Sequence, residues 1–189
     1  FAAKLRFAFG ALRRGRLAWL KPDRSVMVAR YNHESSLYRD ADAVISPSRD
    51  LARIVQEEWG ARPEGIGHVP NPYSPPSALL ELPPTAPRLP LLYIGQLQMR
   101  KGVSDLVEAL ALLEKQGHAM SARFVGHPFP SPRANLDMAE WGARLLPVAS
   151  GRYAFTGRLT REASLAEFAA AGLVVLPSRW EAFGYTCLE

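Results

Sequence analysis

The sequence predicts an α/β protein in which parallel β-sheets carry helices on both faces. Three observations support this prediction: short apolar strands alternate with helical patterns over residues 91–176, a glycine or proline turn follows each of these strands, and the 189-residue chain is 48% hydrophobic. Parallel strands need crossover connections, and alternating strands and helices supply them. The expected fold is therefore a doubly wound sheet, preceded by the end of another α/β segment.

The part of the chain before residue 70 contains the elements of that preceding segment. The expected elements are helices over 1–20, 26–40 and 49–59 and strands over 43–45 and 66–69. Ser48 is a typical N-cap and Gly60 a typical helix end. From Pro70 to Pro90 there are eight prolines in 21 residues without periodicity, which indicates a linker or boundary.

The remaining chain alternates regularly between strands and helices. The expected strands are 91–94, 122–125, 153–156 and 173–176, and the expected helices are 102–116, 134–146 and 161–171. The strands end in turns at Gly95, Gly126, Gly157 and Pro177. Ligands of doubly wound sheets bind outside the carboxyl ends of the strands. We therefore expect these turns to gather at one edge of the sheet and to form the functional site.

The turn after the first of these strands suits a diphosphate. It runs from Gly95 through Arg100 and Lys101 to Gly102 and leads into a helix. Glycine lets a ligand approach the backbone, and a helix N-terminus offers free N–H groups and partial positive charge. The alternative is a tight turn in which Lys101 is a solvated residue at a helix start.

Two glutamates follow the last predicted strand. Glu181 and Glu189 are separated by seven residues, the first in a loop and the second where a helix starts. Ionised carboxylates accept hydrogen bonds, so two of them in one cleft could bind sugar hydroxyls. The alternative is a pair of surface glutamates.

The order of these motifs resembles the retaining glycosyltransferases of family 4, which have the GT-B fold of two facing Rossmann-like domains. The matching stretches are ADAVISPSR (41–49), HVPNPYS (68–74), LLYIGQLQMRKGVSDLVEAL (91–110), ARFVGH (122–127), YAFTGRL (153–159) and LVVLPSRWEAFGYTCLE (173–189). Each stretch is weak alone, whereas six in the family's order and spacing are specific. The family's paired-glutamate motif falls on Glu181 and Glu189.

The resemblance implies roles for individual residues. Lys101 would bind the donor diphosphate and stabilise charge on the departing nucleotide, Glu181 would contact the donor sugar, and Glu189 would contact the ribose. Lys101 and Glu181 are thus the expected catalytic residues. The other expected donor-binding residues are Gly95, Gln96, Arg100, Gly126, Gly157, Arg158, Leu159, Phe183, Gly184 and Tyr185.

Two positions depart from the family's pattern. Gln96 stands where the family usually has arginine, and it supplies no charge. Either Arg100 compensates from four residues further on, or Lys101 acts alone. Pro72 replaces the glycine that usually follows the residue matching Asn71, which predicts a stiffer loop there.

The resemblance also implies a domain organisation and an activity. Residues 1–72 would be the later part of an acceptor-side domain, 73–89 a linker and 90–189 the nucleotide-sugar-binding domain, with both domains incomplete. The enzyme would transfer a hexose from a nucleotide-sugar to a glycan, lipid-linked or other acceptor with retention, without a metal ion or other cofactor, in cell-surface polysaccharide or glycolipid synthesis. Alternatives are a non-catalytic nucleotide-sugar-binding protein and a GT-B nucleotide-sugar epimerase.

The ends of the chain and the distribution of its charges lead to two further expectations, one about completeness and one about partners. The chain starts at Phe1 within a helical pattern and stops at Glu189, so we expect a fragment that is inactive alone. Residues 1–40 hold nine basic and three acidic side chains and so carry a net charge of +6. The whole chain carries +5, so the net charge of the remaining 149 residues is −1. The basic helix 1–20 is either a solvated surface or a peripheral contact with anionic lipid. A nucleic-acid partner is not expected.

The remaining sequence features favour a cytoplasmic protein, either free or peripheral on the inner face of the plasma membrane. No apolar run approaches the roughly 18 residues of a membrane-spanning helix. Cys187 is the single cysteine, which excludes an intrachain disulfide and a cysteine-based metal cluster. A reducing compartment suits such a chain.

Overall fold

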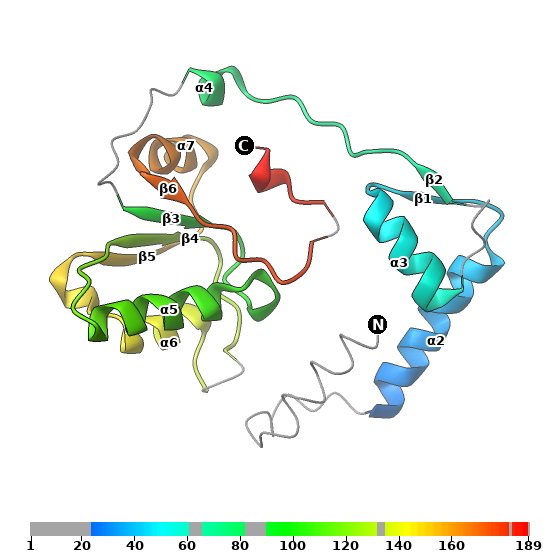
Figure 1. The fold of residues 1–189 in the computed structure, drawn as a ribbon, viewed down its shortest axis with the longest axis horizontal. Coiled ribbons are helices and arrows are strands. Elements are labelled where there is room, and N and C mark those ends of the chain that lie inside the picture. Colours follow the sequence, from blue (N-terminus) through cyan, green and yellow to red (C-terminus); the bar gives the residue numbers. More distant parts are fainter. Residues whose placement is uncertain (1–23, 61–65, 82–89, 132–134, 182, 189) are drawn as a thin grey trace. The chain divides into compact units, whose positions relative to one another are not determined.

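The computed structural model describes residues 24–60, 66–81, 90–131, 135–181 and 183–188 (Figure 1). The helix predicted over 1–20 and the predicted site residue Glu189 lie outside the described residues. The chain divides into two compact units, residues 1–72 and residues 73–189.

The first unit contains two helices and a small parallel sheet. The helices are α2 (Arg24–Asp40) and α3 (Arg49–Trp59), and β1 (Val44–Ser46) pairs in parallel with β2 (Ile66–His68). The side chain of Ser48 accepts a hydrogen bond from the Leu51 amide at 3.1 Å and caps α3, as predicted. Gly60 ends α3 in the left-handed region with φ 69°. The ring of Trp59 joins the helices, because its centroid lies 4.8 Å from that of Tyr38.

The second unit is built on a parallel four-stranded sheet in the order β5-β4-β3-β6. Its strands are β3 (Leu91–Ile94), β4 (Ala122–Val125), β5 (Tyr153–Gly157) and β6 (Leu173–Val174). The first strand along the chain, β3, is therefore internal, with β4 on one side and β6 on the other. The predicted α/β class with parallel strands is confirmed.

Helices cover both faces of this sheet, as Figure 1 shows for α5 and α6 on one face and α7 on the other. The described α-helices of this unit are α4 (Ser77–Leu80), α5 (Val103–Lys115), α6 (Met138–Leu145) and α7 (Arg161–Ala170). Its described 3₁₀ turns are η2 (Met99–Lys101), η3 (Val148–Ser150) and η4 (Tyr185–Cys187). Within the described ranges, no helix is long and apolar enough to cross a bilayer.

Successive side chains of the central strands enter different cores, because neighbouring residues of a strand point to opposite faces. Tyr93 of β3 belongs to the larger cluster, which α5 and α6 complete. Leu92, the residue before it, belongs to the smaller cluster with Ala171 at the end of α7. These two cores fix the sheet between its helical layers and so hold its carboxyl edge in place.

Several predicted ends shift by one or two residues, as in β1, and three further differences concern α6, β6 and α4. The helix expected over 134–146 begins at Met138, because Asp137 accepts hydrogen bonds from the amides of Ala139 and Glu140 and ends the preceding loop. The strand expected over 173–176 has two ladder residues at the edge of the sheet, and beyond them the Val175 amide donates one more hydrogen bond to the Leu92 carbonyl at 2.8 Å. The proline-rich stretch contains the short helix α4, which occupies residues free of proline.

Glu114, near the end of α5, fixes the edge of the sheet where β5 begins. Its carboxylate accepts hydrogen bonds from Arg152 (2.7 Å), from the hydroxyl of Tyr153 (2.6 Å) and from the amide of Met120 (3.2 Å). These hydrogen bonds, that from Arg152 above all, lower the pKa of Glu114 to about 2. The carboxylate is therefore charged over the whole physiological range.

Candidate functional site

The described pocket lies where the sheet changes its winding direction. The chain leaves β3 toward α5 on one face, whereas β6 pairs with the other side of β3 and lies beside α7, which follows β5. Ligands of open α/β sheets bind outside the carboxyl ends of the strands at such a switch point. A cavity of about 330 Å³ occupies this place, between the segments that follow β3 and β6.

The segment after β3 is a tight turn held by backbone hydrogen bonds. The Gly95 amide donates to the Val125 carbonyl at 2.9 Å, which ties the end of β3 to the end of β4. The buried hydroxyl of Tyr93 donates to the Gln96 carbonyl at 2.8 Å and supports the turn from beneath. Burial raises the pKa of Tyr93 well above its ordinary value, so this hydroxyl keeps its proton.

Gly102 brings the segment after β6 against this turn. Its φ is 71°, in the left-handed region where glycine is favoured. A methyl group on its Cα would also overlap the carbonyl oxygen of Pro177. Glycine at 102 is therefore required twice, once for the backbone conformation and once for the contact between the two segments.

Arg179 holds the same two segments together through a second set of contacts. Its amide donates to the Arg100 carbonyl at 3.0 Å. Its guanidinium forms a two-pronged ion pair with Asp105 in the first turn of α5, with Nε and Oδ2 at 2.6 Å. The loop after β6 is thereby fixed to the start of α5, with Lys101 on one segment and Glu181 on the other.

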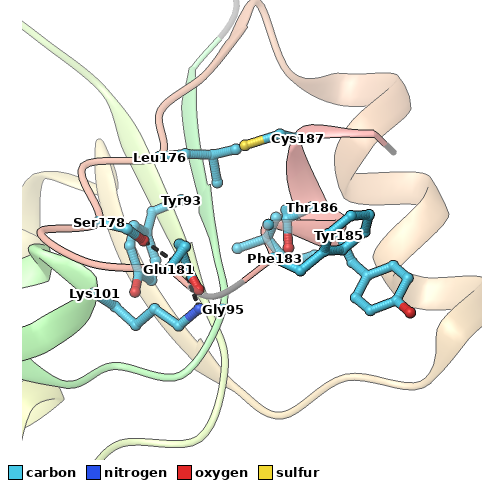
Figure 2. Close-up of a pocket in the computed structure, with 12 residues that line it drawn as sticks. Tyr93, Gly95, Lys101, Leu176, Ser178, Glu181, Phe183, Tyr185, Thr186 and Cys187 are labelled. Carbon is cyan, nitrogen blue, oxygen red and sulfur yellow. Dashed lines mark hydrogen bonds and ion pairs between the residues drawn. The ribbon is translucent and has the colours of Figure 1, made fainter. Parts of the chain in front are cut away.

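Lys101 and Glu181 form an ion pair inside the pocket, through Nζ and Oε1 (Figure 2). The hydroxyl of Ser178 donates to the same oxygen at 2.8 Å. Partial burial alone would raise the pKa of Glu181, but hydrogen bonds from Lys101 and Ser178, together with the charges of Lys101 and Arg100, lower it below the ordinary value. Glu181 is therefore a carboxylate at neutral pH.

The remaining wall of the pocket is largely apolar and aromatic. Figure 2 shows Phe183, Tyr185 and Thr186 set apart from the Lys101–Glu181 pair. The rings of Phe183 and Tyr185 meet edge to face with centroids 5.0 Å apart. The pocket thus combines a charged end with an aromatic wall, as expected for a ligand with an anionic group and a larger body.

Known proteins with similar sequences show the family of this chain. Residues 86–189 match the family model described as glycosyl transferases group 1. The chain belongs to that family. It is 30% identical over 177 residues to a D-inositol 3-phosphate glycosyltransferase of Nocardiopsis dassonvillei, covering 85% of this chain and 40% of that protein. The chain therefore spans about 40% of the length of this curated relative.

Solved glycosyltransferase structures share the fold. Anabaena HepE in complex with UDP and glucose aligns with a TM-score of 0.61 at 20% identity, over 84% of this chain and 44% of HepE. TarM aligns with a TM-score of 0.60 at 14% identity (82% and 28% of the chains). The lipopolysaccharide outer core galactosyltransferase WaaB aligns at 0.55 and 20% identity (78% and 40%). The predicted GT-B type of α/β fold is confirmed.

Within this glycosyl transferases group 1 domain, the structure brings about half of the predicted site residues together. The lining of the pocket includes Gly95, Lys101, Glu181, Phe183, Gly184 and Tyr185. These residues come from two segments of the chain, and Lys101 and Glu181, which form the ion pair between the segments, are 80 residues apart in the sequence. Glu189 lies outside the described residues, so its predicted partnership with Glu181 stays a prediction.

The other predicted residues lie at the same edge of the sheet but not in the lining of this pocket. Gln96 is exposed, and its side-chain oxygen accepts a hydrogen bond from Gln98. Arg100 is exposed on η2, next to Lys101. Gly126 serves packing, because a methyl group on it would overlap the Gly95 carbonyl oxygen.

The predicted residues at the end of β5 have different surroundings. Gly157 has φ 72°, and a methyl group on it would meet nothing within 4 Å. Arg158 is exposed. Leu159 packs against the smaller core cluster, so its side chain supports the sheet. A ligand could reach this corner along the open backbone at Gly157.

Half of the pocket-lining residues were missed from the sequence. They are Tyr93, Ile94, Leu176, Ser178, Thr186 and Cys187. For Ser178 a signal existed, because a serine three residues before the key glutamate is within reach of its carboxylate. The other five carry no comparable signal. Across the described residues, no three His, Cys, Asp or Glu side chains form a group able to hold a metal ion.

Proposed function

We propose that this chain carries the donor site of a retaining, metal-independent family 4 glycosyltransferase, which transfers a hexose from a nucleotide-sugar to an acceptor. The observation that carries the proposal is the Lys101–Glu181 pair in a pocket at the switch point of the sheet. The likeness to HepE, described with UDP and glucose, and to a relative named as a glycosyltransferase supports a nucleotide-sugar donor.

Lys101 is suited to the leaving group of this reaction. When the bond between sugar carbon and phosphate oxygen breaks, the electron pair stays on the diphosphate, and negative charge grows there. An ammonium group has three N–H donors, and Glu181 occupies one of them. The other two can bind phosphate oxygens without releasing Glu181, so the cation is already oriented when charge develops.

Glu181 is suited to the sugar. Its lowered pKa keeps it ionised, and an ionised carboxylate is a hydrogen-bond acceptor only. Ser178 and Lys101 bind its Oε1, and among the described residues none donates a hydrogen bond to Oε2, which suits the hydroxyl groups of a hexose. The pocket volume of about 330 Å³ falls at the lower end of the range for small-molecule sites.

Arg100 provides a second cation beside the pocket. The Lys101–Glu181 pair is close to neutral as a unit, whereas a nucleoside diphosphate brings at least two negative charges. Arg100 is exposed on the same turn, and its charge helps to lower the pKa of Glu181 and opposes the larger rise in the pKa of Tyr93. It is therefore near enough to act on an anion there, which would compensate for the missing charge at Gln96.

The acceptor and the location belong to the same proposal. The relatives are named for different acceptors, an inositol phosphate in one case and the lipopolysaccharide outer core in another. We therefore propose a glycan, a lipid-linked or another hydroxyl-bearing acceptor, with the enzyme in the cytoplasm and its basic residues 1–20 against the inner face of the plasma membrane. The net +6 of residues 1–40 supports such a contact.

The test is a titration of the full-length protein with UDP, GDP and their sugars, followed by transfer assays. The proposal predicts nucleotide binding, transfer with the donor's anomeric configuration kept in the product, and activity unchanged by EDTA. Binding without any turnover would favour a non-catalytic nucleotide-sugar-binding protein. Conversion of the sugar while it is still nucleotide-linked would favour an epimerase.

A further inference from the structure

Tyr73 contacts the end of the pocket wall from a distant part of the chain. Its hydroxyl donates to the Leu188 carbonyl at 2.9 Å, across a separation of 115 residues. Its ring centroid lies 6.3 Å from that of Tyr185, with the planes tilted by 50°. Phe183 meets Tyr185 edge to face, so the three rings form a row in which Tyr73 supports Tyr185 without lining the pocket itself.

The wall that Tyr73 touches has little support of its own. The turn η4 (Tyr185–Cys187) has three residues, and single 3₁₀ turns are weakly stable because their hydrogen-bond geometry is poor. Its own hydrogen bonds are local, from the Cys187 amide to Gly184 and from the Leu188 amide to Tyr185. A partner from elsewhere in the chain is needed to hold such a turn in one position.

The segment around Tyr73 is suited to be that partner. Pro72 precedes the tyrosine and Pro75 follows it two residues later. Proline fixes its own φ and restricts the residue before it, so the segment loses less conformational entropy when it docks. The same Pro72 replaced the glycine expected from the family pattern, which makes the stiffness a property of this chain.

We propose that Tyr73 is a positioning residue for donor binding: it holds η4 so that Phe183 and Tyr185 form one wall of the pocket. Through the Leu188 carbonyl it also fixes the residue that directly precedes Glu189 in the sequence. This inference rests on the proposed function, because the ligand whose affinity it controls is the nucleotide-sugar. It does not assign Tyr73 any contact with the reacting atoms.

The test measures donor KM and kcat for the Tyr73→Phe and Tyr73→Ala variants of the full-length enzyme. Loss of one hydrogen bond predicts a rise in donor KM of about 2- to 10-fold in Tyr73→Phe. Loss of the ring as well predicts a rise of more than ~10-fold in Tyr73→Ala. The kcat changes less than KM in both variants, because the wall contacts bound donor and transition state alike.

Tyr153→Phe is the matched control. It also removes a tyrosine hydroxyl from a hydrogen bond, but at the amino end of β5, and the lost partner is the charged Glu114. It should lower the melting temperature at least as much as Tyr73→Phe does and leave donor KM unchanged. If Tyr73 only stabilised the fold, Tyr73→Phe would also lower the melting temperature and leave donor KM unchanged, as Tyr153→Phe does.

The outcomes also separate this inference from the proposed function. If the wild type binds UDP or GDP and Tyr73→Ala binds it with the same Kd, the positioning role is refuted while the function stands. If the wild type binds neither nucleotide nor their sugars, the proposed function fails and the positioning role fails with it. A folded Tyr73→Phe variant with raised KM and nearly unchanged kcat supports both.

Discussion

Replacing Gly102 with alanine tests how the two pocket segments are held together. Gly102 ends η2 with φ 71°, and its Cα faces the carbonyl oxygen of Pro177. A methyl group there must push the segment after β6 away from the start of α5. Glu181 lies four residues after Pro177, so the displacement would reach the ion pair with Lys101.

Two separate costs determine how much stability Gly102→Ala should lose. An L-residue in the left-handed region costs about 1 kcal/mol or somewhat more. Overlap with a fixed backbone atom adds roughly 1–3 kcal/mol, as other overpacked sites do. We therefore expect Gly102→Ala to lower the free energy of unfolding by about 2–4 kcal/mol and to weaken UDP or GDP binding at least ~10-fold.

Gly151→Ala provides a matched control within the same unit. Gly151 ends the 3₁₀ turn η3 with φ 74°, and a methyl group on it would meet nothing within 4 Å. This variant should lose only the backbone cost of about 1 kcal/mol and keep nucleotide binding. Urea denaturation and calorimetric titration of both variants measure the difference. Equal losses of stability, or unchanged nucleotide affinity in Gly102→Ala, would refute the reasoning.

Three further predictions concern single side chains. Ser104→Ala should raise the free energy of unfolding by about 1 kcal/mol in urea denaturation, because its buried hydroxyl has no hydrogen-bond partner among the described residues; a loss of stability would contradict this. Glu114 has an ordinary pKa of 4.5 and a folded pKa of about 2, so its stabilising contribution is complete above pH 4.5 and is lost as the pH falls toward 2. Glu114→Gln should remove that part of the acid dependence, and an unchanged acid profile would contradict the assignment. Lys101→Ala should lower kcat about 100-fold or more. Arg179→Ala loses a partly exposed ion pair and should lower kcat less than ~10-fold. Equal losses of kcat in the two variants would contradict the roles given to Lys101 and Arg179.

The fold was predictable because each of its signals is local and periodic. The strand 91–94 was predicted with the observed bounds, and Ser48 and Gly60 marked both ends of α3. The start of α6 was missed although the signal was present, because Asp137 and Glu140 form a capping box.

Topology made it predictable that the turns carrying Lys101 and Glu181 lie at one edge of the sheet, and the family resemblance singled out these two residues. Parallel strands direct their carboxyl ends to one edge, so turns far apart in sequence converge there. The contacts that refine the site were not predictable, because they depend on pairwise packing between segments without a shared period. The fit of Gly102 against Pro177 and the hydrogen bond of Tyr73 to Leu188 are of this kind.

The most direct test of the central claim is a calorimetric titration of the full-length protein with the diphosphate it prefers, UDP or GDP, and with the matching nucleoside. Lys101→Ala is compared with Lys115→Ala, an exposed lysine at the other end of α5. If Lys101 grips the diphosphate, Lys101→Ala loses at least ~10-fold in affinity for the diphosphate but binds the nucleoside as the wild type does, and Lys115→Ala changes neither affinity. Equal diphosphate affinity in the wild type and Lys101→Ala would contradict the account.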